Sequence, residues 1–204
     1  MQLIIADKRY SSWSLRGWLA VQLAGEPCEE ILVRLYQPDT RARLLTHSGA
    51  GKVPILKTAH GVIADSLAIA EYLAERHPGL WPEDVAARAL ARSACAQMHS
   101  GFTALRQAMP FDLHHDAPLQ TVSAELQGDL DRMLELLGEC RAARTSEGPW
   151  LFGEQSLADA YFAPIAVRLR SYQVALPAEV ADWADTIYQW PAFKAWQAAG
   201  LEET

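Results

Sequence analysis

The sequence predicts two domains, an α/β first domain followed by an all-helical second domain. Up to Pro78, short apolar and β-branched runs alternate with segments of helical periodicity, whereas the later residues repeat apolar positions at helical spacing throughout. The charge also changes there: nine Lys and Arg stand against eight Asp and Glu up to Pro78, and nine against seventeen beyond it. A chain of 204 residues can form one large core or two modest ones. The shift favours two domains, at 1–78 and 83–204.

The first domain is expected to follow the order β-α-β-α-β-β-α. Ser11 and Ser12 open an amphipathic helix that Gly25 stops. A short crossover helix makes the first two strands parallel. The expected strands are 2–6, 29–35 and a hairpin that turns at 58–61, and the expected helices are 11–24, 38–45 and 66–77.

The second domain is predicted to begin after a linker at 79–82, where two turn-forming residues flank Trp81. Ser156 and Asp159 have the spacing of a capping box, which indicates a role in folding. The expected helices are 83–109, 119–143, 156–170, 178–190 and 191–199.

The hairpin from Lys52 to Ser66 is the most informative stretch. Pro54 cannot donate to a sheet, so the N–H and C=O of Val53 are left available to another group, and a cis bond there would make the turn rigid. Asp65 and Ser66 stand where a helix begins, so the free amides and the Ser66 hydroxyl can hold a carboxylate while Asp65 takes an ammonium group. The hairpin therefore predicts a zwitterionic, amino-acid-like ligand.

Composition excludes several classes of function. A net charge of −7 and a pI near 5.3 argue against nucleic acid as a partner, since phosphate binding needs clustered Lys and Arg. No apolar run approaches a signal-peptide core or a membrane span of about 20 residues, so we expect a cytoplasmic protein. Cys28, Cys95 and Cys140 form no CxxC pair, so neither a disulfide framework nor a metal site is indicated.

Four motifs follow one another along the chain: Tyr10-Ser11-Ser12-Trp13-Ser14-Leu15-Arg16, Gly51-Lys52-Val53-Pro54, Ala64-Asp65-Ser66-Leu67-Ala68-Ile69 and Ser156-Leu157-Ala158-Asp159. In this order they resemble the cytosolic glutathione S-transferases, and the resemblance covers the whole chain. It implies a thioredoxin-like first domain joined to an all-α second domain. The serine-rich motif is similar to the zeta-type Ser-Ser-Cys, with Trp13 where that class has cysteine.

The resemblance implies that glutathione is the cosubstrate. Its cysteinyl backbone would pair with Val53 beside cis-Pro54, its γ-glutamyl group would meet Asp65 and Ser66, and Lys52 would meet the glycyl carboxylate. Taken singly, some of these residues have ordinary structural explanations. Pro54 is also a common strand start, and serine at the position of Ser66 is more often a plain helix N-cap.

The reactive end is expected at Ser11 or Ser12. A thiol with a pKa of about 8.5 is mostly protonated at neutral pH, and a hydroxyl at a helix N-terminus stabilises its thiolate. The resemblance favours Ser11 slightly, and Ser12 stays open. Tyr10 is an alternative donor or a packing residue, and Arg16 either faces an anionic ligand or forms a surface pair. Cysteine is absent from 11–14, which disfavours disulfide exchange.

The electrophile is expected between the domains, against the helix predicted at 83–109. Met98, His99, Phe102, Arg106 and Met109 fall near one face of it. Such a stripe is usually core. Only His99 and Arg106 are therefore candidate substrate contacts.

The resulting hypothesis is a homodimeric glutathione transferase that adds glutathione thiolate to a soft electrophilic small molecule. Dimerisation follows from the resemblance alone. A maleylacetoacetate-isomerase-like activity is one alternative, suggested by the Ser-Ser start and weakened by Trp13. A non-catalytic interaction module of the same fold is another.

Overall fold

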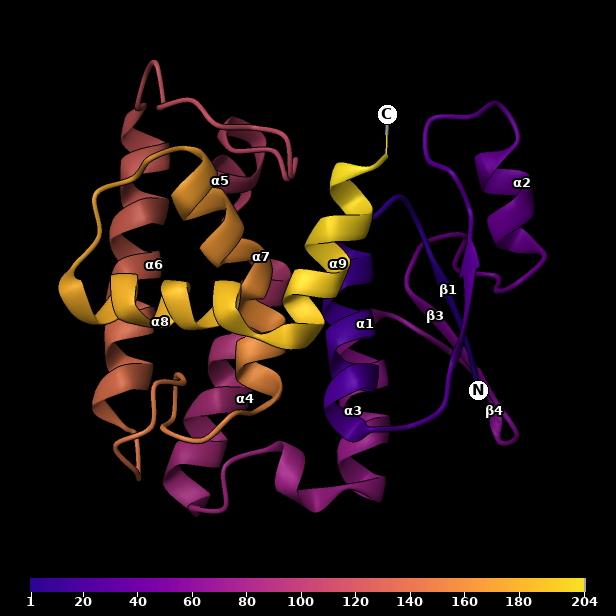
Figure 1. Ribbon diagram of the computed structural model, residues 1–204, viewed down its shortest axis with the longest axis horizontal. Helices are drawn as coiled ribbons and strands as arrows, with labels where there is room; N and C mark the ends of the chain where they lie inside the picture. Colours follow the sequence, from indigo (N-terminus) through magenta and orange to yellow (C-terminus); the bar gives the residue numbers. More distant parts are fainter. Residues whose placement is uncertain (204) are drawn as a thin grey trace.

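The structure, a computed structural model, describes residues 1–203; Thr204, the last residue of the expected helical domain, lies outside the described residues. Figure 1 shows a small sheet at one side of the molecule and a group of helices at the other, with α1 and α3 between them. The first domain comprises β1 (Gln2–Ile5), α1 (Ser12–Ala24), β2 (Glu29–Leu32), α2 (Thr40–Leu45), β3 (Ile55–Thr58), β4 (Gly61–Ala64) and α3 (Ser66–Arg76).

The sheet has the order β2-β1-β3-β4. β1 pairs in parallel with β2 and antiparallel with β3, and β3 continues into β4 through the turn between Thr58 and Gly61. The buried residues Leu3, Ile4 and Ile5 make β1 the apolar centre of the sheet. The predicted element order β-α-β-α-β-β-α and the parallel pairing of the first two strands are confirmed. Gly25 ends α1 with a φ of 65°.

The remaining elements are helical. α7 is buried along most of its length and contacts α1, α4 and α8, so it joins the helical group to the first domain. The bounds are η1 (Pro78–Leu80), a short 3-10 turn, then α4 (Val85–Ser100), α5 (Thr103–Ala108), α6 (Ala124–Ala142), α7 (Leu157–Ser171), α8 (Ala178–Gln189) and α9 (Pro191–Leu201).

The predicted single helix at 83–109 is wrong. It is two helices, α4 and α5, separated at Gly101 and Phe102, and Phe102 has a left-handed φ of 60°. The side chain of Arg106 on α5 turns back and donates to the carbonyls of Met98 and His99 at the end of α4. These carbonyls lack partners within their own helix, so the arginine completes the C-terminus of α4.

Two other predicted elements are shorter than expected. β2 ends at Leu32 instead of residue 35, because the Leu35 N–H turns to the Asp7 carboxylate at 2.6 Å and Tyr36 takes a φ of 58°. The helix expected from 119 begins only after its cap at Ser123.

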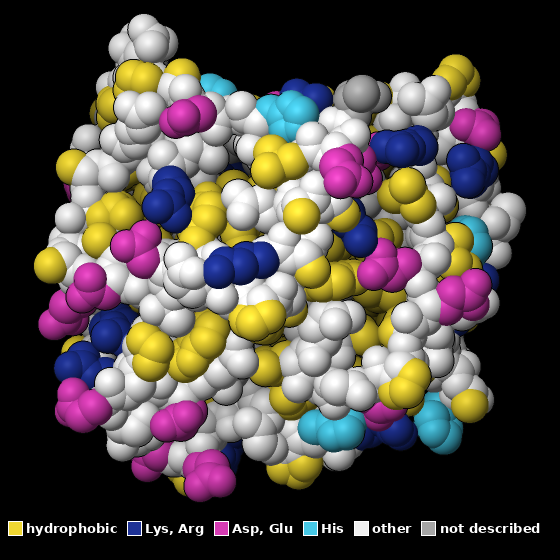
Figure 2. Space-filling model, in the orientation of Figure 1, with side chains coloured by type: hydrophobic (Ala, Val, Ile, Leu, Met, Phe, Trp, Pro, Cys, Tyr) yellow, Lys and Arg dark blue, Asp and Glu magenta, His cyan; other side chains and the backbone are white. Residues whose placement is uncertain are grey.

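The molecule has a charged surface and three cysteines. Figure 2 shows acidic and basic side chains interspersed on one face of the molecule. Within residues 1–203, no helix has both the length and the hydropathy that a bilayer crossing needs, and no group of three or more His, Cys, Asp or Glu is arranged to hold a metal ion. The three cysteines are free thiols.

Candidate functional site

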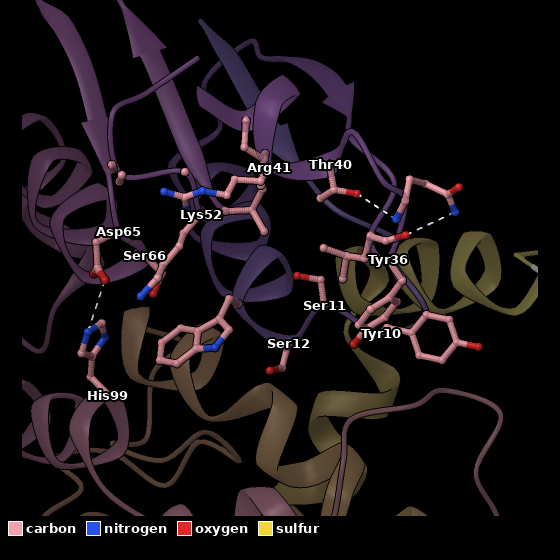
Figure 3. Close-up of a pocket in the computed structure, with 18 of the residues that line it drawn as sticks. Tyr10, Ser11, Ser12, Tyr36, Thr40, Arg41, Lys52, Asp65, Ser66 and His99 are labelled. Carbon is pink, nitrogen blue, oxygen red and sulfur yellow. Dashed lines mark hydrogen bonds and ion pairs between the residues drawn. The ribbon is translucent and has the colours of Figure 1, made fainter. Parts of the chain in front are cut away.

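A cavity of about 1020 Å³ lies on the side of the first domain that meets α4. Figure 3 shows Ser11 and Ser12 near its middle, Asp65, Ser66 and His99 on one side of them, and Tyr10 and Tyr36 on the other. Two predicted site residues, Pro54 and Arg106, do not line the cavity. Those that do are Ser11, Ser12, Lys52, Val53, Asp65, Ser66 and His99.

The start of α1 supplies hydroxyl and amide donors. Ser11 is the N-cap: its Oγ accepts the Ser14 N–H at 3.2 Å and donates to Ser14 Oγ at 2.8 Å. Ser14 Oγ also accepts the Ala6 N–H at 2.9 Å, which ties the helix start to β1. The amides of Ser12 and Trp13 and the Ser12 hydroxyl have no hydrogen-bond partner among residues 1–203. These free donors sit at the positive end of the helix dipole.

Ser14 was missed by the sequence analysis. The signal was present, because Ser14 is three residues after the N-cap, where a capping side chain meets the helix. In the structure Ser14 accepts a hydrogen bond from the Ser11 hydroxyl, which points into the cavity.

The Val53-Pro54 segment forms another wall. The peptide bond is cis, and Pro54 is buried against α1. A Cβ added to Gly17 would lie 2.8 Å from Pro54 Cγ, so only glycine lets the helix approach so closely. β3 pairing begins at Ile55, and the N–H and C=O of Val53 have no backbone partner in the described chain. Lys52 is exposed at the rim.

The start of α3 is tied to the second domain by four polar side chains. The Asp65 carboxylate lies 3.3 Å from His99 Nε2, His99 Nδ1 lies 2.8 Å from the Tyr161 hydroxyl, and that hydroxyl lies 3.0 Å from Ser66 Oγ. Burial raises the pKa of Tyr161 to about 12, so the phenol keeps its proton near neutral pH. No local pattern indicates Tyr161, because its partners Ser66 and His99 are distant along the chain.

Asp65, and not Ser66, is the N-cap of α3. Its carboxylate accepts the Leu67 N–H at 2.8 Å, and its φ of 94° is unusual for a residue other than glycine. The alternative that Ser66 caps the helix is therefore wrong. Ser66 is buried and faces both Tyr161 and the cavity, while about half of the Asp65 side chain remains exposed.

Two arginines lie behind the cavity wall. Arg16 is 2% exposed, with its guanidinium 4.6 Å from the Trp13 ring and 4.7 Å from the Tyr161 ring. Burial lowers the pKa of Arg16 to about 10. The expected surface pair of Arg16 is therefore wrong, and Arg16 does not line the cavity. Arg106 lies 4.8 Å from the same Trp13 ring, so both cations support this tryptophan.

Comparison with known proteins shows what the first domain resembles. Residues 10–76 match the family model described as the glutathione S-transferase N-terminal domain. The first domain is therefore similar to the N-terminal domain of glutathione S-transferases. The Caenorhabditis elegans protein named "Probable maleylacetoacetate isomerase" is 37% identical over 97 residues, which are 47% of this chain and 45% of that relative. The match to this relative thus spans about half of each protein.

Solved structures extend the likeness to the whole chain. A maleyl pyruvate isomerase described as a bacterial glutathione-S-transferase of the Zeta class has a TM-score of 0.77 at 24% identity, covering 100% of both chains. A glutathione transferase homolog from Burkholderia gl BGR1, with bound glutathione, has a TM-score of 0.75 at 21% identity, covering 99% of this chain and 98% of its own. The predicted fold, a thioredoxin-like glutathione S-transferase domain followed by an all-α domain, is confirmed.

Proposed function

We propose that this protein is a glutathione transferase that stabilises bound glutathione thiolate for attack on a soft electrophilic small molecule. One observation carries the proposal. A single cavity brings the start of α1, the unpaired Val53 backbone and the Asp65-Ser66 pair around one space. The donors at the start of α1 match the thiol of one tripeptide. The Val53 backbone matches its peptide groups, and the Asp65 carboxylate matches its ammonium group.

Each part of glutathione has a partner in this arrangement. The γ-glutamyl ammonium group meets Asp65, whose carboxylate is partly exposed, and the adjacent carboxylate meets the start of α3. The cysteinyl backbone pairs with Val53. The glycyl carboxylate meets Lys52, and Arg41, which the sequence analysis did not single out, lines the same part of the cavity.

In this proposal the glutathione thiolate lies at the start of α1. Ser11 donates its hydroxyl hydrogen to the sulfur, and Ser14 can then donate its own to Ser11 Oγ, 2.8 Å away. A chain of hydroxyls polarises each donor in turn, and the helix N-terminus adds a further favourable field. The thiol proton leaves to water. Ser12, whose hydroxyl is free of partners in the described chain, is the competing donor.

The test is an ultraviolet titration of the thiolate of bound glutathione across pH. We expect a thiol pKa at least about one unit below its value of about 8.5 in solution. Ser11→Ala should remove the shift, whereas Ser12→Ala should retain it. Absence of glutathione binding would contradict the proposal, and binding with an unshifted thiol would favour the non-catalytic module. A shift that depends on Ser12 would transfer the donor role to that residue.

A glutathione-dependent isomerase is a second candidate. Similarity to a probable maleylacetoacetate isomerase and to a Zeta-class fold favours it. The two reactions differ in glutathione consumption, because conjugation removes one thiol per turnover whereas isomerisation returns it. Counting free thiol during turnover of a cis-configured keto acid and of a soft electrophile such as an aryl halide separates them.

Three further properties remain proposals. A homodimeric state follows from the resemblance, whereas a cytoplasmic location and domain limits at 1–78 and 83–204 follow from the composition and the apolar pattern of the sequence. Sedimentation of the purified protein tests the first, localisation of the tagged protein the second, and limited proteolysis within 79–82 the third.

A further inference from the structure

We propose that His99 positions the γ-glutamyl end of glutathione by taking up a proton from solvent when the tripeptide binds. The inference rests on the proposed function and adds a role for the second domain in the glutathione site. Its basis is the chain of polar contacts that joins Asp65, His99, Tyr161 and Ser66 in that order. Figure 3 shows the two ends of this chain, Asp65 and Ser66, beside each other at the cavity, with His99 facing Asp65.

The number of hydrogens in this chain fixes the direction of each bond. The Asp65 carboxylate only accepts, so His99 Nε2, 3.3 Å away, carries a hydrogen. In a neutral imidazole Nδ1 is then bare, and the Tyr161 phenol, 2.8 Å away, gives it its only hydrogen. Ser66 Oγ, 3.0 Å from the same phenol, must in turn donate to Tyr161. While His99 is neutral, Ser66 therefore offers only lone pairs to the cavity.

A γ-glutamyl carboxylate requires the opposite direction. It has no hydrogen to donate, so it bonds to Ser66 only if the Ser66 hydroxyl hydrogen turns toward it. If that happened beside a neutral His99, the Ser66 and Tyr161 oxygens would face each other without a hydrogen between them, which costs a buried hydrogen bond. A second proton on the imidazole removes this conflict. Nδ1–H then donates to Tyr161, Tyr161 donates to Ser66, and Ser66 donates to the ligand.

Net charge alone does not decide whether the imidazole gains this proton. The Asp65 carboxylate favours it, whereas two guanidinium groups oppose it: Arg16 lies 4.7 Å from the Tyr161 ring, and Arg106 donates to a carbonyl at the end of α4. Burial raises the pKa of the Tyr161 phenol and of the Cys95 thiol, so both stay neutral near pH 7. The ligand adds one carboxylate and one ammonium group, which nearly cancel. The direction of the hydrogen bonds is therefore the deciding factor.

The test is calorimetry with S-methylglutathione, which keeps the γ-glutamyl end but has no thiol proton to release. Titrations at about pH 7.5 in phosphate and in Tris, whose ionisation enthalpies differ, give the number of protons taken up per ligand. Wild-type protein should take up at least about 0.3 proton, because histidine ordinarily changes its charge between about pH 5 and 8. The affinity should accordingly fall at least about twofold for each pH unit.

Two variants test the route through the chain. His99→Gln should bind S-methylglutathione without proton uptake, because glutamine keeps a donor and an acceptor but does not titrate. Tyr161→Phe should also abolish the uptake, although His99 is still present, because the Ser66 hydrogen is then free in either state of the imidazole. A purely structural role of these side chains would change the affinity and leave the number of protons unaltered.

His47→Gln is the matched control. His47 follows α2, which lines the cavity through Arg41, but it does not line the cavity itself and has no contact with the chain. This variant should take up as many protons as the wild-type protein.

Three outcomes would overturn the inference while glutathione binding stands. They are no proton uptake by the wild-type protein, loss of the uptake in His47→Gln, and full uptake in Tyr161→Phe. The first two decide the matter even where a variant of the buried chain does not fold. Wild-type protein that binds neither glutathione nor S-methylglutathione would overturn the proposed function as well.

Discussion

Helices α1 and α7 both start at a serine N-cap, and they differ in what faces their first turns. At α7, the fully buried Asp159 accepts the Ser156 N–H at 2.9 Å, the Leu151 N–H at 2.9 Å and the Trp183 indole N–H at 3.0 Å. At α1, Ser11 binds Ser14, while the following two amides open on a cavity. A helix start whose polar groups are paired within the protein stabilises the fold. A helix start that opens on a cavity has amide and hydroxyl donors that a ligand can use.

Asp159→Ala tests the structural member of the pair and should have the largest effect. It leaves several buried donors without an acceptor, so the free energy of unfolding should fall by roughly 3–5 kcal/mol. Urea denaturation measures this. Asp182→Ala, on the exposed side of α8, is the control and should change stability by less than about 0.5 kcal/mol. Equal losses in the two variants would remove the distinction between the helix starts.

Of these two helix starts, only that of α7 should contribute to the pH dependence of stability. Burial raises the pKa of Asp159 to about 6, although its hydrogen-bond donors oppose the shift. Between about pH 4 and 6 the native protein keeps a proton that the unfolded chain has lost. This group therefore lowers stability as the pH rises through that window, by at most about 3 kcal/mol.

The difference between variants isolates this contribution from that of the other carboxylates. Urea denaturation at several pH values should show wild-type protein losing stability relative to Asp159→Asn between pH 4 and 6. Ser11→Ala should follow the wild-type pH profile, because a hydroxyl cap does not titrate there. Parallel profiles for wild type and Asp159→Asn would show that Asp159 is not protonated in this window.

Removing either capping serine should have a moderate effect on stability. Ser11→Ala and Ser156→Ala should each lower the free energy of unfolding by about 1 kcal/mol, since the first loses the bond to the Ser14 N–H and the second loses the bond that its hydroxyl donates to Asp159. Only Ser11→Ala should also raise the pKa of bound glutathione. A thiol titration that changes equally in both variants would contradict the functional role of the α1 start.

Ser12→Ala should have the smallest effect. Its hydroxyl has no partner within the described chain, so thermal or urea unfolding should change by less than about 0.5 kcal/mol. A larger loss of stability would mean that Ser12 carries part of the helix start that we assign to Ser11.

Most of the fold could be predicted from local sequence patterns. Gly25 ends α1 and the hairpin turns at the expected residues, because these features depend on nearby side chains and backbone conformations. The break between α4 and α5 could not be predicted from periodicity. It depends on a left-handed Phe102 and on Arg106 reaching back across the turn.

The same limit applies to the site. The hairpin motif indicated Val53, Asp65 and Ser66, and the structure brings them to one cavity. Tyr161 could not be found, because its contacts with Ser66 and His99 span 95 and 62 residues of sequence.

Trp13, supported by two guanidinium groups and touching the edge of His99, gives the protein an optical reporter. It lines the cavity, and none of the other six tryptophans does. A ligand that displaces water from the cavity should therefore shift the indole emission of this residue and leave the buried indoles unchanged. In Trp13→Phe, the emission of the other six tryptophans should stay constant when ligand is added. Subtracting it isolates the Trp13 signal, so occupancy of the cavity can be followed without a label.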